Sequence, residues 1–223
     1  MRPGPPIDAA GIVAHLRSLR NGRNIAGQTR FGITPSTERL GIAIPVLRKI
    51  ARGRRRDHGL ALSLWASGIH EARILASYVD DPDRVSARQM DAWARDFDSW
   101  DVCDQVCGNL FDRTPHAVAK AASWSCARAE FVKRAGFCMM ACLAAHRRDL
   151  PDRVLAGFLP MIRREAHDGR NFVRKAANWA LRVIGKRSPA LRRAAVAEAR
   201  RIARLGSPSA RWIASDALRE LGK

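Results

Sequence analysis

The sequence lacks a run of about 20 apolar residues, which is the length that a membrane-spanning helix requires. Its first residues, Met1-Arg2-Pro3-Gly4-Pro5-Pro6, also lack the apolar stretch of a secretory signal peptide. Strict alternation of apolar and polar residues, the mark of half-buried strands, is missing as well. We therefore expect an all-α protein that stays in the cytoplasm and uses no membrane.

Acidic residues are scarce beside basic ones. The chain has 223 residues, with 21 Asp and Glu against 40 Lys and Arg, a formal net charge of +19. The excess is spread through the helical segments and is not confined to a tail. This distribution favours a folded basic surface that meets nucleic acid, with an anionic membrane surface as the weaker alternative.

Cysteine is sparse, and its odd number of five argues against a disulfide framework. Four of the five occur four residues apart, as Cys103 with Cys107 and Cys138 with Cys142. Each pair falls on one helix face, where small buried residues are the simpler interpretation. A four-thiolate metal site would require the two helices to face each other closely, and nothing else in the sequence asks for it. We expect no metal and a reducing compartment.

Apolar residues recur at helical spacing along most of the chain. A first helix is expected from Ile7 to Arg20, ended by Asn21-Gly22, and another begins at Pro45 after an irregular stretch over residues 23–44. Later starts are expected where a capping side chain precedes proline, at Asp81-Pro82, Thr114-Pro115, Ser188-Pro189 and Ser207-Pro208. Ends are expected at five glycines: Gly68, Gly157, Gly169, Gly185 and Gly206.

The chain repeats itself. The segment Phe131-Val132-Lys133-Arg134-Ala135 returns as Phe172-Val173-Arg174-Lys175-Ala176 after 41 residues (172 − 131), and Ala210-Arg211-Trp212-Ile213-Ala214 echoes both. Helix pairs at this period are typical of HEAT-like repeats, which stack into a superhelical solenoid with a concave face. We expect residues 1–223 to form a single domain of this kind, with residues 1–30 as an N-terminal helical cap.

Equivalent repeat positions project into the same groove. The basic set Lys133, Arg134, Arg174, Lys175 and Arg182 is therefore expected to line that groove, although any one of these cations could be an ordinary solvated side chain. Trp179 follows Lys175 by four residues and precedes Arg182 by three, so it shares their face. The other tryptophans outside the central stretch are expected to be structural: Trp65, Trp93, Trp124 and Trp212.

The central stretch, residues 97–111, combines an aromatic and a carboxylate at helical spacing. Ser99 falls at an N-cap position, so Trp100 and Asp104 lie four residues apart on one face of the first turns and can act on one ligand. A separate apolar stripe would bury this helix: Val102, Val106, Leu110 and Phe111. In the alternative interpretation Trp100 is a core aromatic and Asp104 a solvated charge.

Three segments together resemble the AlkD-like DNA alkylation repair glycosylases: Ser99-Trp100-Asp101-Val102-Cys103-Asp104, Phe131-Val132-Lys133-Arg134-Ala135, and residues 171–182 from Asn171 to Arg182. The resemblance implies HEAT-like repeats with a concave basic surface for duplex DNA, and removal of cationic N3- and N7-alkylated purines. It implies that Trp100 and Asp104 form the functional pair, that Trp179 is the second active-site tryptophan and that Arg134 contacts DNA. Ala43 and Ile44 depart from the polar, DNA-contacting residues that the best-known members of that family carry before the proline, which is Pro45 here.

The chemistry of such a lesion fits a carboxylate without a general acid. An alkylated purine already carries a positive charge, so it leaves without protonation, and Asp104 would stabilise the oxocarbenium-like sugar. We expect a monofunctional, monomeric glycosylase of base excision repair that needs no cofactor, since Lys133 and Lys175 show no desolvated setting for a Schiff base. The alternative is a non-catalytic HEAT-repeat module that binds nucleic acid or an acidic protein.

Overall fold

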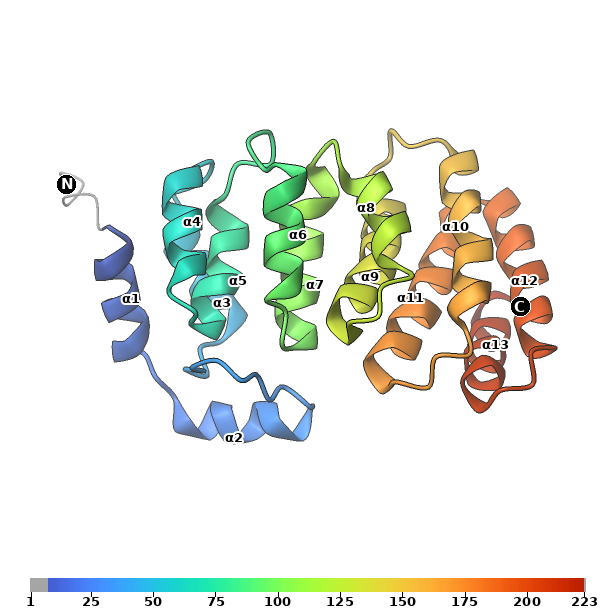
Figure 1. Ribbon diagram of the computed structural model, residues 1–223, viewed down its shortest axis with the longest axis horizontal. Coiled ribbons are helices and arrows are strands. Elements are labelled where there is room, and N and C mark those ends of the chain that lie inside the picture. Colours follow the sequence, from blue (N-terminus) through green and yellow to red (C-terminus); the bar gives the residue numbers. More distant parts are fainter. Residues whose placement is uncertain (1–7, 223) are drawn as a thin grey trace. The chain divides into compact units, whose positions relative to one another are not determined.

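The computed structural model describes residues 8–222 and shows an all-α fold without strands over that range (Figure 1). Residues 1–7 and 223 lie outside the described part, so the expected helical cap over 1–30 is described only from Asp8 onward. Among the described residues, no helix has both the length and the apolar character that crossing a membrane demands.

The helices fall into two compact units. Unit 1 comprises the residues up to Val85 together with Asp98–Leu110, and unit 2 comprises Ser86–Phe97 together with the residues from Phe111 onward. Whether all of them act as one domain, as the sequence predicts, stays a prediction.

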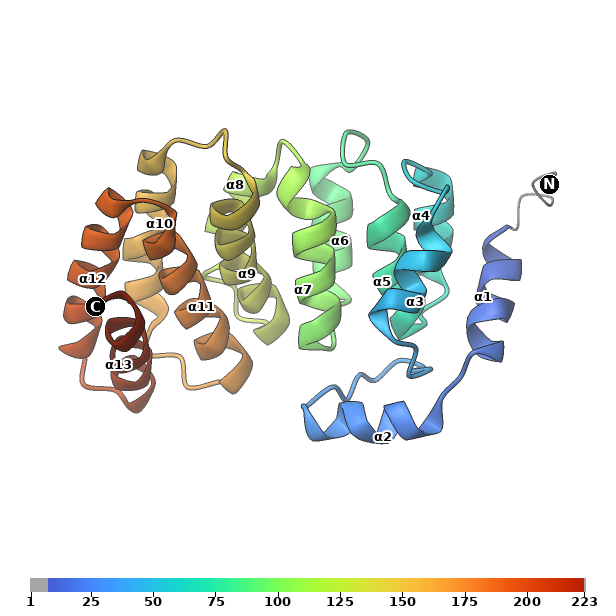
Figure 2. The same cartoon turned by 180° about the vertical axis from the view of Figure 1, so that it is seen from behind.

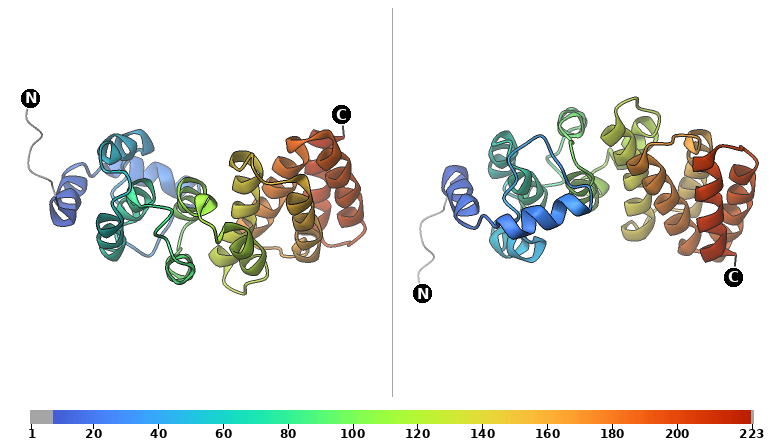
Figure 3. Two further views of the ribbon diagram at one scale, coloured as in Figure 1. Left: turned by 90° about the horizontal axis from the view of Figure 1, so that it is seen from above. Right: turned by 90° about the horizontal axis from the view of Figure 1, so that it is seen from below.

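Unit 1 holds six helices in its described residues: α1 (Ala9–Ser18), α2 (Gly22–Arg30), α3 (Ile44–Ala51), α4 (His58–Ala66), α5 (His70–Val79) and α7 (Trp100–Asn109). Helix α5 packs against α3, α4 and α7. Helix α2 crosses below the ends of α3 and α5, which the view from below in Figure 3 makes clear. Unit 1 therefore buries α5 at its centre and leaves α2 on its surface.

Unit 2 contains α6 (Ala87–Arg95), the short 3-10 helix η1 (Phe111–Arg113), α8 (Ala117–Trp124), α9 (Glu130–His146), α10 (Asp152–Glu165), α11 (Asn171–Arg187), α12 (Pro189–Ala203) and α13 (Pro208–Leu221). Three successive pairs pack together: α8 with α9, α10 with α11 and α12 with α13. The second helices α9, α11 and α13 also contact one another in that order (Figure 2). The predicted HEAT-like pairs are confirmed.

The repeat found in the sequence corresponds to the second helices. Phe131 is the second residue of α9 and Phe172 is the second residue of α11, and the centroids of their rings are 5.6 Å apart. The buried apolar stripe of α7 is also as predicted, with Val102 and Val106 fully buried. The four cysteines that occur four residues apart are free and buried, Cys103 and Cys107 in unit 1 and Cys138 and Cys142 in unit 2. No group of three or more possible metal ligands occurs within residues 8–222.

Several predicted boundaries are right because they depend on local capping. Ser188 and Ser207 are the N-caps of α12 and α13, and each side chain accepts a hydrogen bond from a backbone N–H three residues on. Helix α3 begins at Ile44 with Pro45 in its first turn. Gly68 and Gly206 follow the ends of α4 and α12 with positive φ.

Other boundaries are wrong. Asp81-Pro82 and Thr114-Pro115 lie in turns, and α6 and α8 begin later, after Ser86 and His116. Asn21 does not close the helical region, because its side chain caps α2, a helix that the sequence analysis missed. Gly157 and Gly185 lie inside α10 and α11. At Gly185 a Cβ atom would come within 2.6 Å of Leu221 Cδ1, so close packing against α13 explains this glycine.

Candidate functional site

Trp100 and Asp104 lie four residues apart on α7 and line one cavity of unit 1, with a volume of about 350 Å³. Ser99 is the N-cap residue of α7, as predicted, but its hydroxyl donates to Asp101 and does not accept from the helix backbone. Both Trp100 and Asp104 are half-buried, which differs from the fully buried tryptophan and solvated carboxylate of the alternative interpretation. The structure therefore brings the predicted pair together at a cavity.

The indole of Trp100 is fixed by a hydrogen bond. Its Nε1–H donates to the carbonyl oxygen of Phe31 at 3.0 Å. Phe31 follows the last residue of α2, so this bond ties the loop after α2 to the first turn of α7. The bond limits rotation of the ring, and a ring held in one orientation can present its π face to a ligand at little entropic cost.

Two further polar residues of the cavity, His70 and Asp101, form a pair. His70 Nε2 is 2.8 Å from Asp101 Oδ2, and His70 itself is 1 % exposed. Burial raises the pKa of the Asp101 carboxyl, but the hydrogen bonds from His70 and from Ser99 outweigh burial and leave that pKa below its ordinary value. Asp101 is therefore an ionised carboxylate that joins α5 to α7 beside Asp104.

Glu71 completes the wall of the cavity from α5. Its carboxylate accepts three backbone N–H groups: Oε2 accepts from Leu40 at 2.9 Å, and Oε1 accepts from Gly41 at 2.6 Å and Ile42 at 3.2 Å. This turn leads into Ala43 and Ile44, which also line the cavity. The segment that, according to the resemblance, carries polar groups in the best-known AlkD-like glycosylases is thus apolar here, and a buried carboxylate holds it in place.

Sequence reasoning missed His70 and Glu71 because their contacts join residues about 30 positions apart. One local signal was present, since two ionisable residues open a helix whose next positions are mostly apolar. Buried charges of this kind are rarely tolerated unless they are paired. Asp101 lies within the central stretch, but the spacing and the resemblance assigned functions only to Trp100 and Asp104 there.

The predicted DNA-binding cations lie in unit 2, and two of them are buried. Lys133 is 8 % exposed and its Nζ lies 2.7 Å from Glu165 and 3.2 Å from Asp168. Arg134 is 6 % exposed and donates to the carbonyl oxygen of Phe172 at 2.7 Å. These side chains hold α9 to neighbouring elements. The sequence analysis had expected both of them to project freely into the groove. Their contact with DNA stays a prediction.

The cations of α11 are more accessible. Lys175 is exposed, and Arg174 stacks over the ring of Trp212 at 5.1 Å from the centroid. Arg182 donates to Glu220 of α13 at 2.6 Å, and Trp179 is half-buried between these positions in the sequence. Trp212 was expected to be structural, yet it is 37 % exposed, whereas Trp65, Trp93 and Trp124 are buried as predicted. The sequence analysis missed Trp212 because the stacking cation comes from another helix.

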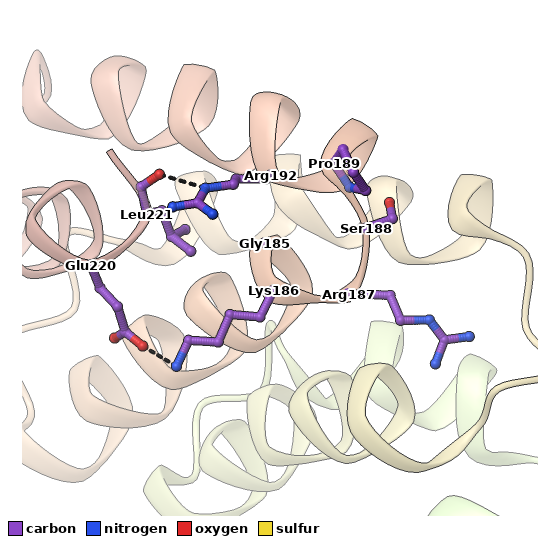
Figure 4. Close-up of a pocket in the computed structure, with 8 residues that line it drawn as sticks. All are labelled: Gly185, Lys186, Arg187, Ser188, Pro189, Arg192, Glu220 and Leu221. Atoms are coloured by element: carbon purple, nitrogen blue, oxygen red, sulfur yellow. Dashed lines mark hydrogen bonds and ion pairs between the residues drawn. The ribbon is translucent and has the colours of Figure 1, made fainter. Parts of the chain in front are cut away.

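A second cavity, of about 470 Å³, lies near the C-terminal helices of unit 2 (Figure 4). Three cations line it, Lys186, Arg187 and Arg192, and all three have partners: Figure 4 draws those of Lys186 and Arg192, and Arg187 Nη2 donates to the carbonyl oxygen of Arg148 at 3.0 Å. Lys186 pairs with Glu220, and Arg192 Nε donates to the carbonyl oxygen of Leu221 at 2.9 Å. None of the predicted site residues lines this cavity, so the cavity at Trp100 and Asp104 is the candidate active site.

Similarity to known proteins identifies the family to which the chain belongs. No curated protein matches the chain. A solved structure described as "A new family of proteins related to the HEAT-like repeat DNA glycosylases with affinity for branched DNA structures" has the same fold, with a TM-score of 0.78 and 20 % identity over 96 % of both chains. The sequence model of the family described as "DNA alkylation repair enzyme" matches residues 12–221. HEAT-like helix pairs, a basic chain and this match over nearly its whole length show that the protein belongs to the DNA alkylation repair enzyme family.

Proposed function

We propose that the protein is a monofunctional DNA glycosylase that hydrolyses the N-glycosidic bond of cationic N3- and N7-alkylated purines in duplex DNA. One observation carries this proposal: in a member of the DNA alkylation repair enzyme family, a carboxylate and an aromatic ring four residues apart line one cavity. The proposed setting is base excision repair in the cytoplasm, by a monomer acting on double-stranded DNA.

The substrate itself supplies much of the driving force. Alkylation at N3 or N7 places a positive charge on the purine, so the base departs as a neutral molecule and needs no general acid. The sugar then develops oxocarbenium character, which a fixed carboxylate stabilises electrostatically. We assign this role to Asp104, which would also orient the attacking water and accept its proton. Neither a metal nor a cofactor is required by these steps.

Trp100 would hold the cationic nucleotide. Its ring is fixed through Nε1, and the face of an indole attracts a cation by about 1–3 kcal/mol when water is displaced. An uncharged purine gains less from the same contact, which gives the site a preference for the alkylated base. Trp179 keeps its proposed part as a second aromatic, on the basis of the family resemblance alone.

A lysine nucleophile is not part of the proposal. Strand cleavage through a Schiff base needs an amine in its neutral form. The Nζ atom of Lys133 lies between two carboxylates, and Lys175 is exposed to water without a desolvating pocket. Both settings favour hydrolysis by water over covalent catalysis.

A second candidate function is DNA binding without catalysis. The structural neighbour is described as having affinity for branched DNA structures, and the net charge of +19 fits such a role equally well. Asp104 favours the first candidate, because a negative charge that faces the DNA weakens binding to phosphate, whereas a glycosylase uses that charge at the sugar.

The deciding experiment is release of N7-methylguanine from duplex DNA. Asp104→Asn preserves shape but removes the charge, so base release should fall by about 10²–10³ while DNA binding is kept or slightly improved. Asp83→Asn is the matched control, since the Asp83 side chain is 70 % exposed in the same unit. A wild-type protein that released no base would refute the glycosylase proposal and favour the scaffold. A folded Asp104→Asn protein that released base at the wild-type rate would refute the role of Asp104.

A further inference from the structure

Phe31 is the most exposed of the large apolar side chains within residues 8–222. It is 74 % exposed, while the others that reach the surface are 37–47 % exposed, namely Val46, Leu62, Leu205 and Trp212. A single exposed apolar residue is common in proteins and says little by itself. What distinguishes Phe31 is its place in unit 1.

Phe31 adjoins the candidate active site through its backbone. Its carbonyl oxygen accepts the Nε1–H of Trp100, and its sequence neighbourhood contains Gln28 and Ile33, which line the cavity. Gly32 has a φ of +73°, and the chain reverses there, with the N–H of Ile33 donating to Gln28 at 3.2 Å. Phe31 is thus the outward residue of a tight turn between two residues of the cavity wall.

The loop that carries Phe31 is anchored. Asp98 Oδ2 accepts four hydrogen bonds at 2.9–3.2 Å, from the N–H and the hydroxyl of both Ser36 and Thr37. Arg39 Nη2 donates to Thr29 Oγ1 at 3.1 Å on the other side of the turn. An exposed aromatic on an anchored loop loses little conformational entropy when it meets a partner, which makes it effective as a contact residue.

The sequence on either side of Phe31 is basic. No acidic residue occurs between Asp8 and Glu38 in the sequence, whereas Arg23 and Arg30 are exposed on α2. No residue of α2 is fully buried, and its exposed face, which includes Arg23 and Arg30, is available at the surface. An aromatic ring flanked by cations is the combination that binds nucleic acid, since the ring stacks on a base while the cations meet phosphates.

We propose that Phe31 stacks on a base next to the nucleotide held at Trp100, in DNA whose base stacking is locally opened. The inference rests on the proposed function only in that DNA occupies the cavity. In a regular duplex the faces of the bases are covered by their neighbours, so Phe31 contributes where a base is unpaired or displaced. Phe31 therefore selects opened DNA, whereas the cations of α2 bind any DNA.

The experiment compares two duplexes of the same length, one fully paired and one with a single bulged base, by fluorescence anisotropy. Phe31→Ala should weaken binding to the bulged duplex about tenfold and to the paired duplex less than about twofold. Phe31→Trp should restore the selectivity, because the indole also stacks. Leu62→Ala is the control, since Leu62 is an apolar residue of unit 1 that is 42 % exposed, and it should change neither affinity.

Two results would overturn the inference: a wild-type protein that binds both duplexes equally, or a Phe31→Ala protein whose affinities equal those of wild type or fall by the same factor for both. Thermal unfolding of Phe31→Ala should match wild type, because an exposed ring contributes little to stability. Base release separates this test from the glycosylase proposal. If Phe31→Ala lost selectivity but the wild-type protein released no base, only the glycosylase proposal would be refuted. If the wild-type protein released base but Phe31→Ala kept its selectivity, only the role of Phe31 would be refuted.

Discussion

Replacing Glu71 by Gln should loosen the wall of the candidate site and lower the stability of unit 1. The Glu71 carboxylate is 1 % exposed and accepts three backbone N–H groups of the turn at residues 40–42. A glutamine can retain the two bonds of one oxygen, but its amide group then faces the N–H of Leu40, donor against donor. At least one charge-assisted hydrogen bond is lost and the other two become neutral.

The size of the effect follows from these bonds. A hydrogen bond to a charged group contributes about 1.5–3 kcal/mol and a neutral one about 1 kcal/mol, so the loss of one bond and the weakening of two others amount together to about 2.5–7 kcal/mol. For a chain of this length, each kcal/mol corresponds to about 2–4 °C, which predicts a fall in Tm of at least about 5 °C. Gly41 adds to the cost, because at φ +75° a Cβ atom at its position would lie only 2.4 Å from the carbonyl oxygen of Asn21, so the turn has no room to rearrange.

The assay is thermal unfolding followed by circular dichroism, together with hydrogen exchange of the amides of Leu40, Gly41 and Ile42. Those three amides should exchange faster in Glu71→Gln. Glu38→Gln is the matched control, since Glu38 forms an exposed ion pair with Arg17 and such pairs contribute little to stability. A Glu71→Gln protein with the wild-type Tm and unchanged exchange at these amides would refute the reasoning.

Three further predictions concern DNA binding and pH. The affinity for undamaged duplex should fall at least tenfold from low to physiological salt, since each phosphate contact releases counterions; an affinity that hardly changes with salt in a filter-binding titration would contradict the basic surface. Arg134→Ala should weaken binding of lesion-containing and undamaged duplex by similar factors, because phosphate contacts do not read the base; loss for the lesion alone, measured by anisotropy, would exclude that role. The hydrogen bond from Arg170 holds the pKa of Asp168 at about 2, below its ordinary value of 3.8, so the stabilisation by ionised Asp168 is complete above pH 3.8 and is lost as the pH falls toward 2. The Tm difference between wild type and Asp168→Asn should shrink over that range, and a pH-independent difference would contradict this assignment.

The sequence predicted what depends on neighbours along the chain. Ser188 and Ser207 cap their helices through backbone groups three residues away, and Trp100 and Asp104 share a face because a helix brings every fourth residue into line. The repeat at Phe131 and Phe172 was legible for the same reason, since each copy occupies the same place in its own helix.

What the sequence did not predict depends on distant partners. Lys133 resembles a surface cation until Glu165 and Asp168 come within hydrogen-bonding distance of its Nζ. The sequence did not predict helix α2, because the helix has no fully buried residue and therefore shows no apolar residues at helical spacing. The Glu71 turn joins residues 29–31 positions apart, a distance at which no spacing rule operates.

The division of the chain into units has a consequence for proteolysis. Unit 1 takes up the chain as far as Val85 and again over Asp98–Leu110, while α6, which lies between these stretches, belongs to unit 2. Neither unit is therefore one continuous length of polypeptide. A single cut by a protease cannot release either unit intact. A fragment that ends at Val85 lacks Trp100 and Asp104. A fragment that ends at Leu110 includes α6 and so separates it from the helices of unit 2 that it packs against. The parts of the candidate active site are thus covalently joined only while the chain through α6 is uncut.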